Sequence, residues 1–266
     1  MQANTVISGY QLMVQQIAEQ RPSLQGLLKN FVSPLKEQLT DAPTSRSLIE
    51  ISGASNSGKT WLLSQILLQC LLLHSVDGGN GVQCQVVLFN LSHKLKPAHF
   101  EKQLRAKIKA LQCFKDEKEE AEIFNKCKES LIFINCFSTD DFDLAFDVVE
   151  NVLLDNEQIA MLAIDTLGAF YWEDTSRIRV RMNTHYARAL ARLRKLCNSH
   201  NICCVFTVNE NYASGRGLSA ASFSAVGAAA AADYALKIKL SEQGERSING
   251  HAFSIDDKGF LEWLNI

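Results

Sequence analysis

The sequence has few of the features that mark metal-stabilised, secreted or membrane proteins. Its eight cysteines include no C-x-x-C pair and no zinc-ligand spacing, which argues against a structural zinc site. The start lacks the apolar segment of a secretory signal peptide, and no apolar run approaches the roughly 18 residues of a membrane-spanning helix. We therefore expect a soluble protein without a membrane partner, in a reducing compartment such as the cytosol or the nucleus.

The sequence also lacks a strong overall charge. Its 266 residues carry a formal net charge of −2 at pH 7, without a long run of Lys or Arg. Nothing in this balance attracts nucleic acid globally, so any basic surface has to be local. With 47% hydrophobic and 21% charged residues, the chain is globular and long enough for one large α/β domain.

One stretch fits the phosphate-binding pattern G-x-x-x-x-G-K-[ST] at every required position. It follows a short apolar strand at 48–52 and precedes an apolar helix, a context that a chance match in a loop rich in Gly and Ser would not explain. In such a loop, backbone N–H groups and the helix N-terminus face the phosphates, Lys59 adds positive charge, and Thr60 offers Mg²⁺ a hydroxyl ligand. The predicted nucleotide-binding residues are Gly53, Ala54, Ser55, Asn56, Ser57, Gly58, Lys59 and Thr60.

Apolar strands alternate with helical patterns from residue 48 onward. This alternation predicts an α/β fold with a mostly parallel central sheet and helices on both faces. Residues 1–47 form a leader with a helical pattern over 9–20, and residues 48–266 form the core domain. The leader is either an arm that packs on its own core or a segment that docks on another subunit. The predicted strands are 48–52, 85–90, 131–135, 158–165, 202–208 and 234–240.

Asp165 ends an apolar strand that begins at Gln158. A carboxylate at the tip of a parallel strand is the usual companion of a phosphate loop, where it holds Mg²⁺ through water beside the loop hydroxyl. Any buried parallel strand can end in Asp, but after a phosphate loop this one is a metal-site candidate together with Thr60.

Several segments together resemble RecA-type recombinase paralogues. This resemblance implies a RecA-like P-loop NTPase core that binds ATP and Mg²⁺, ends in a C-terminal β-hairpin and uses Asn209 as a polar sensor residue. It also implies homologous-recombination repair in a hetero-oligomer with other paralogues, contact with single-stranded or branched DNA through the complex, and action in the nucleus, with the cytoplasm as a second compartment. The segments are Ser8–Leu12, the phosphate loop, Leu162–Trp172 (the most specific), Cys203–Asn209, His251–Ile255 and Gly259–Glu262.

Two positions depart from the recombinase pattern. Ser92 stands where active recombinases carry the glutamate that activates the attacking water, and a serine hydroxyl is a poor base near pH 7. The neighbouring His93 offers an imidazole as a substitute base, but adjacent residues at a strand end point in different directions. Val226–Gly227 stands where the family often has paired glycines. Both departures favour nucleotide binding with weak turnover, and we assign no catalytic residue.

Basic residues gather after the strand that ends in Asp165. Arg177, Arg179 and Arg181, and Arg216 in a Gly- and Ser-rich stretch at 211–223, are candidates for contact with DNA or a partner. The alternative for this stretch is a loop that binds no ligand. Tyr171 and Trp172 are suited to stack on bases, but aromatics directly after a buried strand are more often core residues, so we expect them to pack.

Three functions therefore remain open. The first is an ATP-binding assembly subunit of a recombination-repair complex, with chemistry weak or absent. The second is a competent DNA-stimulated ATPase of the RecA type. A P-loop kinase or transferase is more remote, because the sequence offers no separate lid segment rich in arginine.

Overall fold

A computed structural model describes residues 8–24, 27–28, 31, 45–73, 84–111, 114–177, 179–210, 232–256 and 259–264. The strands are β1 (Leu48–Gly53), β2 (Gln85–Asn90), β3 (Leu131–Asn135), β4 (Ile159–Asp165), β5 (Cys203–Asn209), β6 (Tyr234–Leu240), β7 (Arg246–Ile248), β8 (His251–Ile255) and β9 (Leu261–Trp263). The helices are α1 (Gly9–Gln20), α2 (Lys59–Leu73), α3 (Pro97–Leu111), α4 (Glu117–Glu129), α5 (Thr139–Asp155), α6 (Tyr171–Arg177) and α7 (Met182–His200).

The strands form one sheet in the order β3-β2-β4-β5-β1-β6-β7-β8-β9. Every pair from β3 to β6 is parallel, and the remaining pairs are antiparallel. The predicted α/β fold with a mostly parallel sheet is therefore confirmed, as is the C-terminal hairpin of β8 and β9. The antiparallel part is larger than predicted, because the short strand β7 pairs with both β6 and β8.

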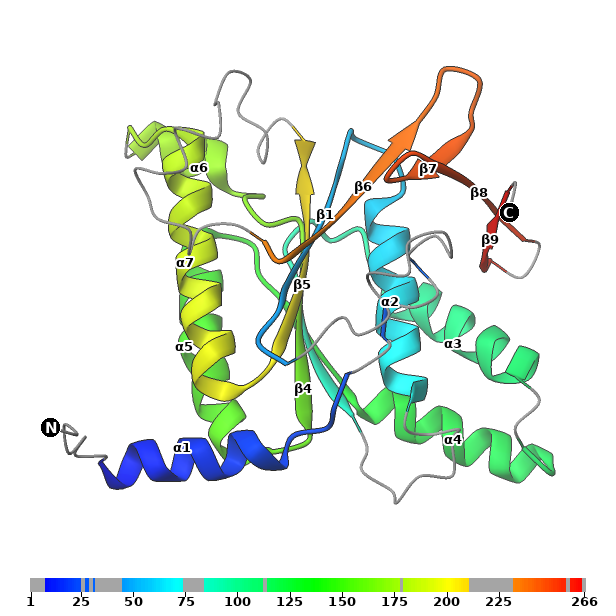
Figure 1. Cartoon of the computed structure of the whole chain (residues 1–266), viewed down its shortest axis with the longest axis horizontal. Coiled ribbons are helices and arrows are strands. Elements are labelled where there is room, and N and C mark those ends of the chain that lie inside the picture. Colours follow the sequence, from blue (N-terminus) through cyan, green and yellow to red (C-terminus); the bar gives the residue numbers. More distant parts are fainter. Residues whose placement is uncertain are drawn as a thin grey trace, which may run out of the picture.

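Helices cover both faces of the parallel part (Figure 1). Because successive side chains of a strand point to opposite faces, Val86 and Leu88 join the core beneath α2, α3 and α4, whereas Val87 and Phe89 join the core beneath α5 and α7. Every residue of β4 is buried, which explains its uninterrupted apolar run. Among the described helices, none combines the length and apolar character that crossing a membrane requires.

The C-terminal strands are joined to α2 by aromatic contacts. Trp61, in the first turn of α2, stacks on Phe253 of β8 with ring centroids 5.8 Å apart and planes 10° apart. Trp263 of β9 meets the same ring edge-on at 6.2 Å. The helix that follows the phosphate loop is thus packed against the antiparallel end of the sheet.

The leader has two parts with different surroundings. Helix α1 begins at a capping box, in which Ser8 and Gln11 each accept a hydrogen bond from the other's backbone N–H, and it lies along the end of α7 (Figure 1). The four apolar side chains of the second part are buried in the core that contains α2, so they pack on the chain's own domain. These residues are Leu24, Leu27, Leu28 and Phe31. The predicted boundary at residue 47 stays a prediction.

Arg21 lies between these two parts and is 7% exposed. Its guanidinium donates to the carbonyl oxygens of His200 at 2.7 Å, Asn156 at 2.9 Å and Ile159 at 2.6 Å, and also to that of Leu153. Three of these carbonyls belong to the C-terminal ends of α5 and α7, where carbonyl groups lack helical partners and a cation is favoured. Burial lowers the pKa of Arg21 to about 10, so the side chain is still charged at neutral pH.

We expect the substitution Arg21→Ala to lower the free energy of unfolding by roughly 2–4 kcal/mol, because buried carbonyl groups lose their charged donor. Urea denaturation followed by circular dichroism measures this loss. Arg188→Ala, which removes an exposed arginine of α7, is the control and should cost less than about 0.5 kcal/mol. Similar unfolding midpoints for the two variants would contradict the assignment.

Candidate nucleotide-binding site

The phosphate loop connects β1 to α2, and its backbone needs its glycines. Gly58 has a φ of 109°, a conformation that residues with a side chain rarely adopt. A Cβ on Gly53 would lie 2.4 Å from the carbonyl oxygen of Ile238, so only glycine fits between β1 and β6. Helix α2 then begins at Lys59, and its N-terminus faces the loop as an anion-binding end.

Lys59 is folded back over the loop. Its Nζ donates to the carbonyl oxygens of Gly53 at 2.9 Å and Ala54 at 2.6 Å. Within the described residues, no carboxylate lies at ion-pair distance from this ammonium group. The pKa of Lys59 is lowered overall. Burial is the largest cause and repulsion from Lys94 the second, while attraction to Asp165 and Glu210 offsets part of the shift. The loop therefore holds a positive charge that uncharged carbonyl groups satisfy and that an anion would neutralise.

Asp165 is fully buried at the end of β4. Its Oδ1 accepts hydrogen bonds from the hydroxyls of Thr60 and Thr207, both at 3.0 Å, and its Oδ2 accepts one from Ser92. A buried carboxylate is stable only when donors surround it. Asp165 thus brings α2, β5 and the loop after β2 together around one side chain.

The backbone turns sharply after Asp165. Thr166 has a φ of 72°, which is strained for a β-branched residue, and such strain is concentrated at functional sites. The turn is held by the hydroxyl of Thr207, which accepts from the N–H of Thr166 at 2.7 Å. The sequence analysis missed Thr207 because its only signal is one hydroxyl residue in an otherwise apolar strand.

The oxygen atoms at this corner suit Mg²⁺. The ion prefers hard oxygen ligands and usually takes one or two carboxylates together with substrate phosphates, and here the Thr60 hydroxyl touches the Asp165 carboxylate. The buried Ser57 hydroxyl has no hydrogen-bond partner within the described residues, so the loop also retains an unused polar group. Thr60 and Asp165 are the residues that would hold Mg²⁺, and the ion would supply positive charge to neutralise phosphate oxygens there.

Ser92 occupies the position of the expected glutamate, and its hydroxyl already donates a hydrogen bond to Asp165. His93, the next residue, has a φ of 56°, and its ring is directed away from Asp165. The His93 Nε2 lies 3.0 Å from the carbonyl oxygen of Cys136, and the ring stacks on Phe137 with centroids 4.4 Å apart. His93 is therefore held in other contacts and does not replace the missing carboxylate.

Asn209 ends β5 beside the phosphate loop. Its position in the sheet is opposite Gly53, and its Nδ2 donates to the Ser55 hydroxyl at 3.2 Å. The structure thus brings the predicted sensor residue, the loop, Thr60, Asp165 and Ser92 to one edge of the sheet.

Two of the four predicted DNA or partner residues lie on the connection between α6 and α7. Arg179 and Arg181 are exposed there, whereas the side chain of Arg177 and all of Arg216 lie outside the described residues. Tyr171 packs as expected, with its hydroxyl donating to the Val180 carbonyl at 3.0 Å.

For Trp172 the expectation of packing was wrong, because this residue is 72% exposed. Tyr171 and Trp172 are the first two residues of α6. Neighbouring residues on a helix face different directions, so only one of the two reaches the core.

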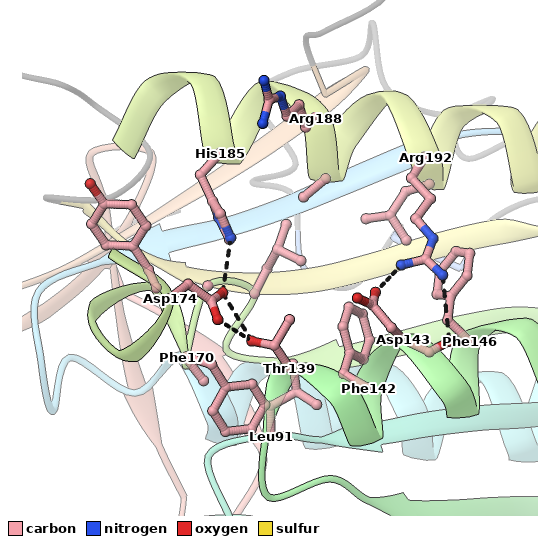
Figure 2. Close-up of a pocket in the computed structure, with 16 residues that line it drawn as sticks. Leu91, Thr139, Phe142, Asp143, Phe146, Phe170, Asp174, His185, Arg188 and Arg192 are labelled. Atoms are coloured by element: carbon pink, nitrogen blue, oxygen red, sulfur yellow. Dashed lines mark hydrogen bonds and ion pairs between the residues drawn. The ribbon is translucent and has the colours of Figure 1, made fainter. Parts of the chain in front are cut away.

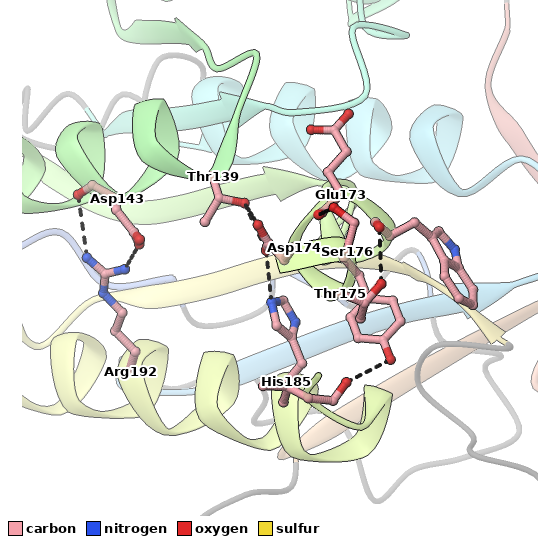
Figure 3. A network of polar contacts seen from close by, with 11 residues as sticks. Thr139, Asp143, Glu173, Asp174, Thr175, Ser176, His185 and Arg192 are labelled. Atoms are coloured by element: carbon pink, nitrogen blue, oxygen red, sulfur yellow. Dashed lines mark hydrogen bonds and ion pairs between the residues drawn. The ribbon is translucent and has the colours of Figure 1, made fainter. Parts of the chain in front are cut away.

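A cavity of about 240 Å³ lies between α5, α7 and the segment after β4 (Figure 2). Near it, Asp174 of α6 accepts from the Thr139 hydroxyl at 2.8 and 2.9 Å and lies 3.4 Å from His185 Nε2 (Figure 3). In a nucleophile–histidine–carboxylate triad, the histidine lies between the other two groups. Here the Asp174 carboxylate lies between Thr139 and His185. These contacts instead join α6 to α5 and α7.

This cavity does not serve the phosphate loop. Its lining helices cover the face of the sheet opposite α2 (Figure 1). A phosphoryl group held by Lys59 would therefore lie on the other side of the sheet from this cavity.

A mostly parallel sheet with a phosphate loop after β1 and a carboxylate at the tip of β4 defines a P-loop NTPase core of the RecA-like type. A family model described as an AAA domain matches residues 18–209, and the chain belongs to that family.

Two curated relatives carry DNA-repair names. The DNA repair protein XRCC2 homolog of Arabidopsis thaliana is 22% identical over 62% of this chain and 55% of its own length. The DNA repair protein XRCC2 of Mus musculus is 27% identical over 63% of this chain and 54% of its own length. The chain thus spans about half the length of the curated relatives it matches. These relatives confirm the resemblance to recombinase paralogues, and within them to X-ray repair cross-complementing protein 2, which the residues around Asp165 had indicated.

Proposed function

We propose that this chain is an ATP-binding subunit of a recombinase-paralogue complex that acts in homologous-recombination repair of DNA double-strand breaks, with weak or absent ATP hydrolysis. The observation that carries the proposal is the contrast within one site. The residues proposed to hold nucleotide and Mg²⁺ lie together at one edge of the sheet, whereas Ser92 donates to Asp165 at the position where active recombinases carry a water-activating glutamate. The names of the two relatives supply the repair context. Imaging of a tagged chain in intact cells tests the nuclear location that this context implies.

We expect Lys59→Ala to weaken binding of ATP with Mg²⁺ by roughly ten- to a hundredfold, because a charge-assisted phosphate contact contributes about 1.5–3 kcal/mol. Isothermal titration calorimetry on the purified chain measures the two affinities. Lys96→Ala, which removes an exposed lysine from a neighbouring loop, is the control and should bind like wild type. Equal affinity in wild type and Lys59→Ala would overturn the nucleotide site.

We expect slow ATP turnover in wild type and a gain of at least about tenfold in Ser92→Glu. A positioned general base is worth about 10²- to 10⁴-fold, of which the substitution recovers a part because the new carboxylate lies beside Asp165. Phosphate release in a steady-state assay measures the rates, and Ser92→Ala serves as the control that removes the hydroxyl without adding a base. The alternative, a competent DNA-stimulated ATPase, is supported if wild type hydrolyses ATP rapidly in the presence of DNA and Lys59→Ala abolishes this activity.

Docking on another paralogue is proposed for the part of the leader that the core does not use. On α1, Tyr10 and Leu12 are each 54% exposed and Met13 is 44% exposed. A second apolar surface lies at and before α5, the helix that follows the edge strand β3, with Phe137, Leu144 and Val148 exposed. Deleting residues 1–31 would also remove Arg21 and the buried leucines, so point variants are needed.

We expect the double variant Leu12→Ser with Met13→Ser to lose its paralogue partner in pull-downs from native cells while keeping its unfolding midpoint, since both side chains are exposed. The control is Gln16→Ser with Gln20→Ser, which changes exposed polar positions of the same helix. If the apolar variant keeps the partner and Leu144→Ser with Val148→Ser loses it, the docking face is the β3 edge. If neither loses it, both assignments fail.

DNA contact is proposed at the connection between α6 and α7, where exposed Trp172 adds an aromatic surface to Arg179 and Arg181. The contacts of Asp174 with Thr139 and His185 hold this short helix to its neighbours (Figure 3), so the aromatic ring is presented on a fixed support. An aromatic platform contributes about 1–3 kcal/mol per stacked base, and arginines add phosphate contacts.

We expect Trp172→Ala to weaken single-stranded DNA binding by the native complex about five- to a hundredfold, with the lost stacking as the reason. Arg179→Ala with Arg181→Ala should reduce the slope of log affinity against log salt by roughly 1.4, about 0.7 for each lost contact. Fluorescence anisotropy with a labelled oligonucleotide measures both. Arg188→Ala is the matched control and should bind like wild type. Wild-type affinity in both Trp172→Ala and the arginine double variant would exclude this surface.

A further inference from the structure

The cavity between α5, α7 and the segment after β4 has an aromatic wall. Phe142 and Phe146 of α5 line it (Figure 2). Both rings pack on the buried Phe89 of β2, with centroids 5.2 and 6.3 Å away, and their own centroids are 5.9 Å apart. Rings that pack on one another in this way restrict each other's orientation, so α5 presents a fixed aromatic surface to the cavity.

The two carboxylates that line the cavity already have partners. Asp174 accepts from the Thr139 hydroxyl at 2.8 and 2.9 Å and lies 3.4 Å from His185 Nε2. Asp143 of α5 forms an ion pair with Arg192 of α7. These contacts join the helices around the cavity, and they leave neither carboxylate as an uncompensated negative charge.

Arg188 differs from the other charged residues of the lining. It lies three residues after His185 and four before Arg192, so the three basic side chains follow one face of α7, and all three line the cavity. Within the part of the chain that the structure describes, no carboxylate lies at ion-pair distance from Arg188. An anion at this position would therefore gain a charged partner without breaking an existing ion pair.

The size and lining of the cavity limit the kind of molecule that fits. Sites for drug-sized ligands usually have about 300–1,000 Å³ and mostly apolar walls with a few polar groups. This cavity has about 240 Å³, which suits a molecule of one or two rings. Leu91, Leu167 and Leu193 add apolar contacts to those of the aromatic wall, and a flat ring packs well on aromatic side chains.

We propose that this cavity binds a small planar aromatic molecule that carries a carboxylate or another anionic group. Its rings pack on Phe142 and Phe146, and its anion pairs with Arg188. The helices that line the cavity cover the face of the sheet opposite α2, so this ligand does not occupy the phosphate loop. The site is thus additional to the proposed nucleotide site.

The first test uses naphthoate as the probe and naphthamide, its uncharged counterpart of nearly equal shape. Chemical-shift titration of the purified chain by NMR measures both affinities. Wild type should bind naphthoate about two- to fivefold more tightly, the range expected for an exposed charge pair. Arg188→Ala should abolish this preference and Arg188→Lys should keep part of it. Lys195→Ala, which removes an exposed lysine of α7 outside this cavity, is the control and should preserve it.

The second test locates the bound probe. Ala189→Leu on α7 and Ala169→Leu after β4 each fill part of the cavity and should weaken binding of both compounds at least about tenfold, because a close-packed site has no room for both groups. Circular dichroism checks that each variant keeps a folded structure. Nuclear Overhauser contacts between naphthoate and Phe142 locate the probe in wild type without any substitution. Lys59→Ala should bind naphthoate like wild type.

Several results would overturn this proposal. Wild type that does not bind naphthoate has no such site, and equal affinities for naphthoate and naphthamide in wild type contradict the role of Arg188. Loss of naphthoate binding in Lys59→Ala would place the probe at the phosphate loop, as would displacement of naphthoate by ATP with Mg²⁺. Absence of contacts with Phe142, or full affinity in both filled variants, would place it elsewhere on the surface. None of these results alters the ATP affinities that test the proposed function.

Discussion

The buried carboxylate of Asp165 is the constraint on which the carboxyl edge of the sheet depends. Removing such a charge from water costs several kcal/mol unless donors compensate it, and here three hydroxyls do so. These donors come from three elements that are far apart in the sequence: helix α2, strand β5 and the loop that follows β2. One side chain therefore fixes the phosphate loop relative to the sheet, and the strained backbone at Thr166 is held by the same set of contacts.

Much of the fold was predictable because its signals are local. A strand buried on both faces needs a continuous apolar run, so β4 and its final Asp165 were visible in the sequence, as was the phosphate loop with its required glycines. The direction of His93 was also predictable, because consecutive residues at a strand end diverge. The same geometric rule, applied to the first two residues of a helix, would have separated Tyr171 from Trp172, but the start of α6 was not recognised.

The remaining features depend on partners that a local pattern does not contain. Arg21 lies in a polar stretch and gives no sign that its guanidinium is buried among four carbonyl groups. Thr207 is one hydroxyl in an apolar strand. Each acquires its role only when chain folding brings a distant group to it, so neither of the two could be identified from its neighbours in sequence.

The contacts of Arg21 also have a consequence for the order of events during synthesis. Its four acceptors lie 132 to 179 residues further along the chain, and the N-terminal part of a protein leaves the ribosome first. Closing so long a loop costs entropy before its contacts form. The segment around Arg21 is thus made well before the groups that hold it, and until residue 200 has emerged, this side chain has no finished set of acceptors.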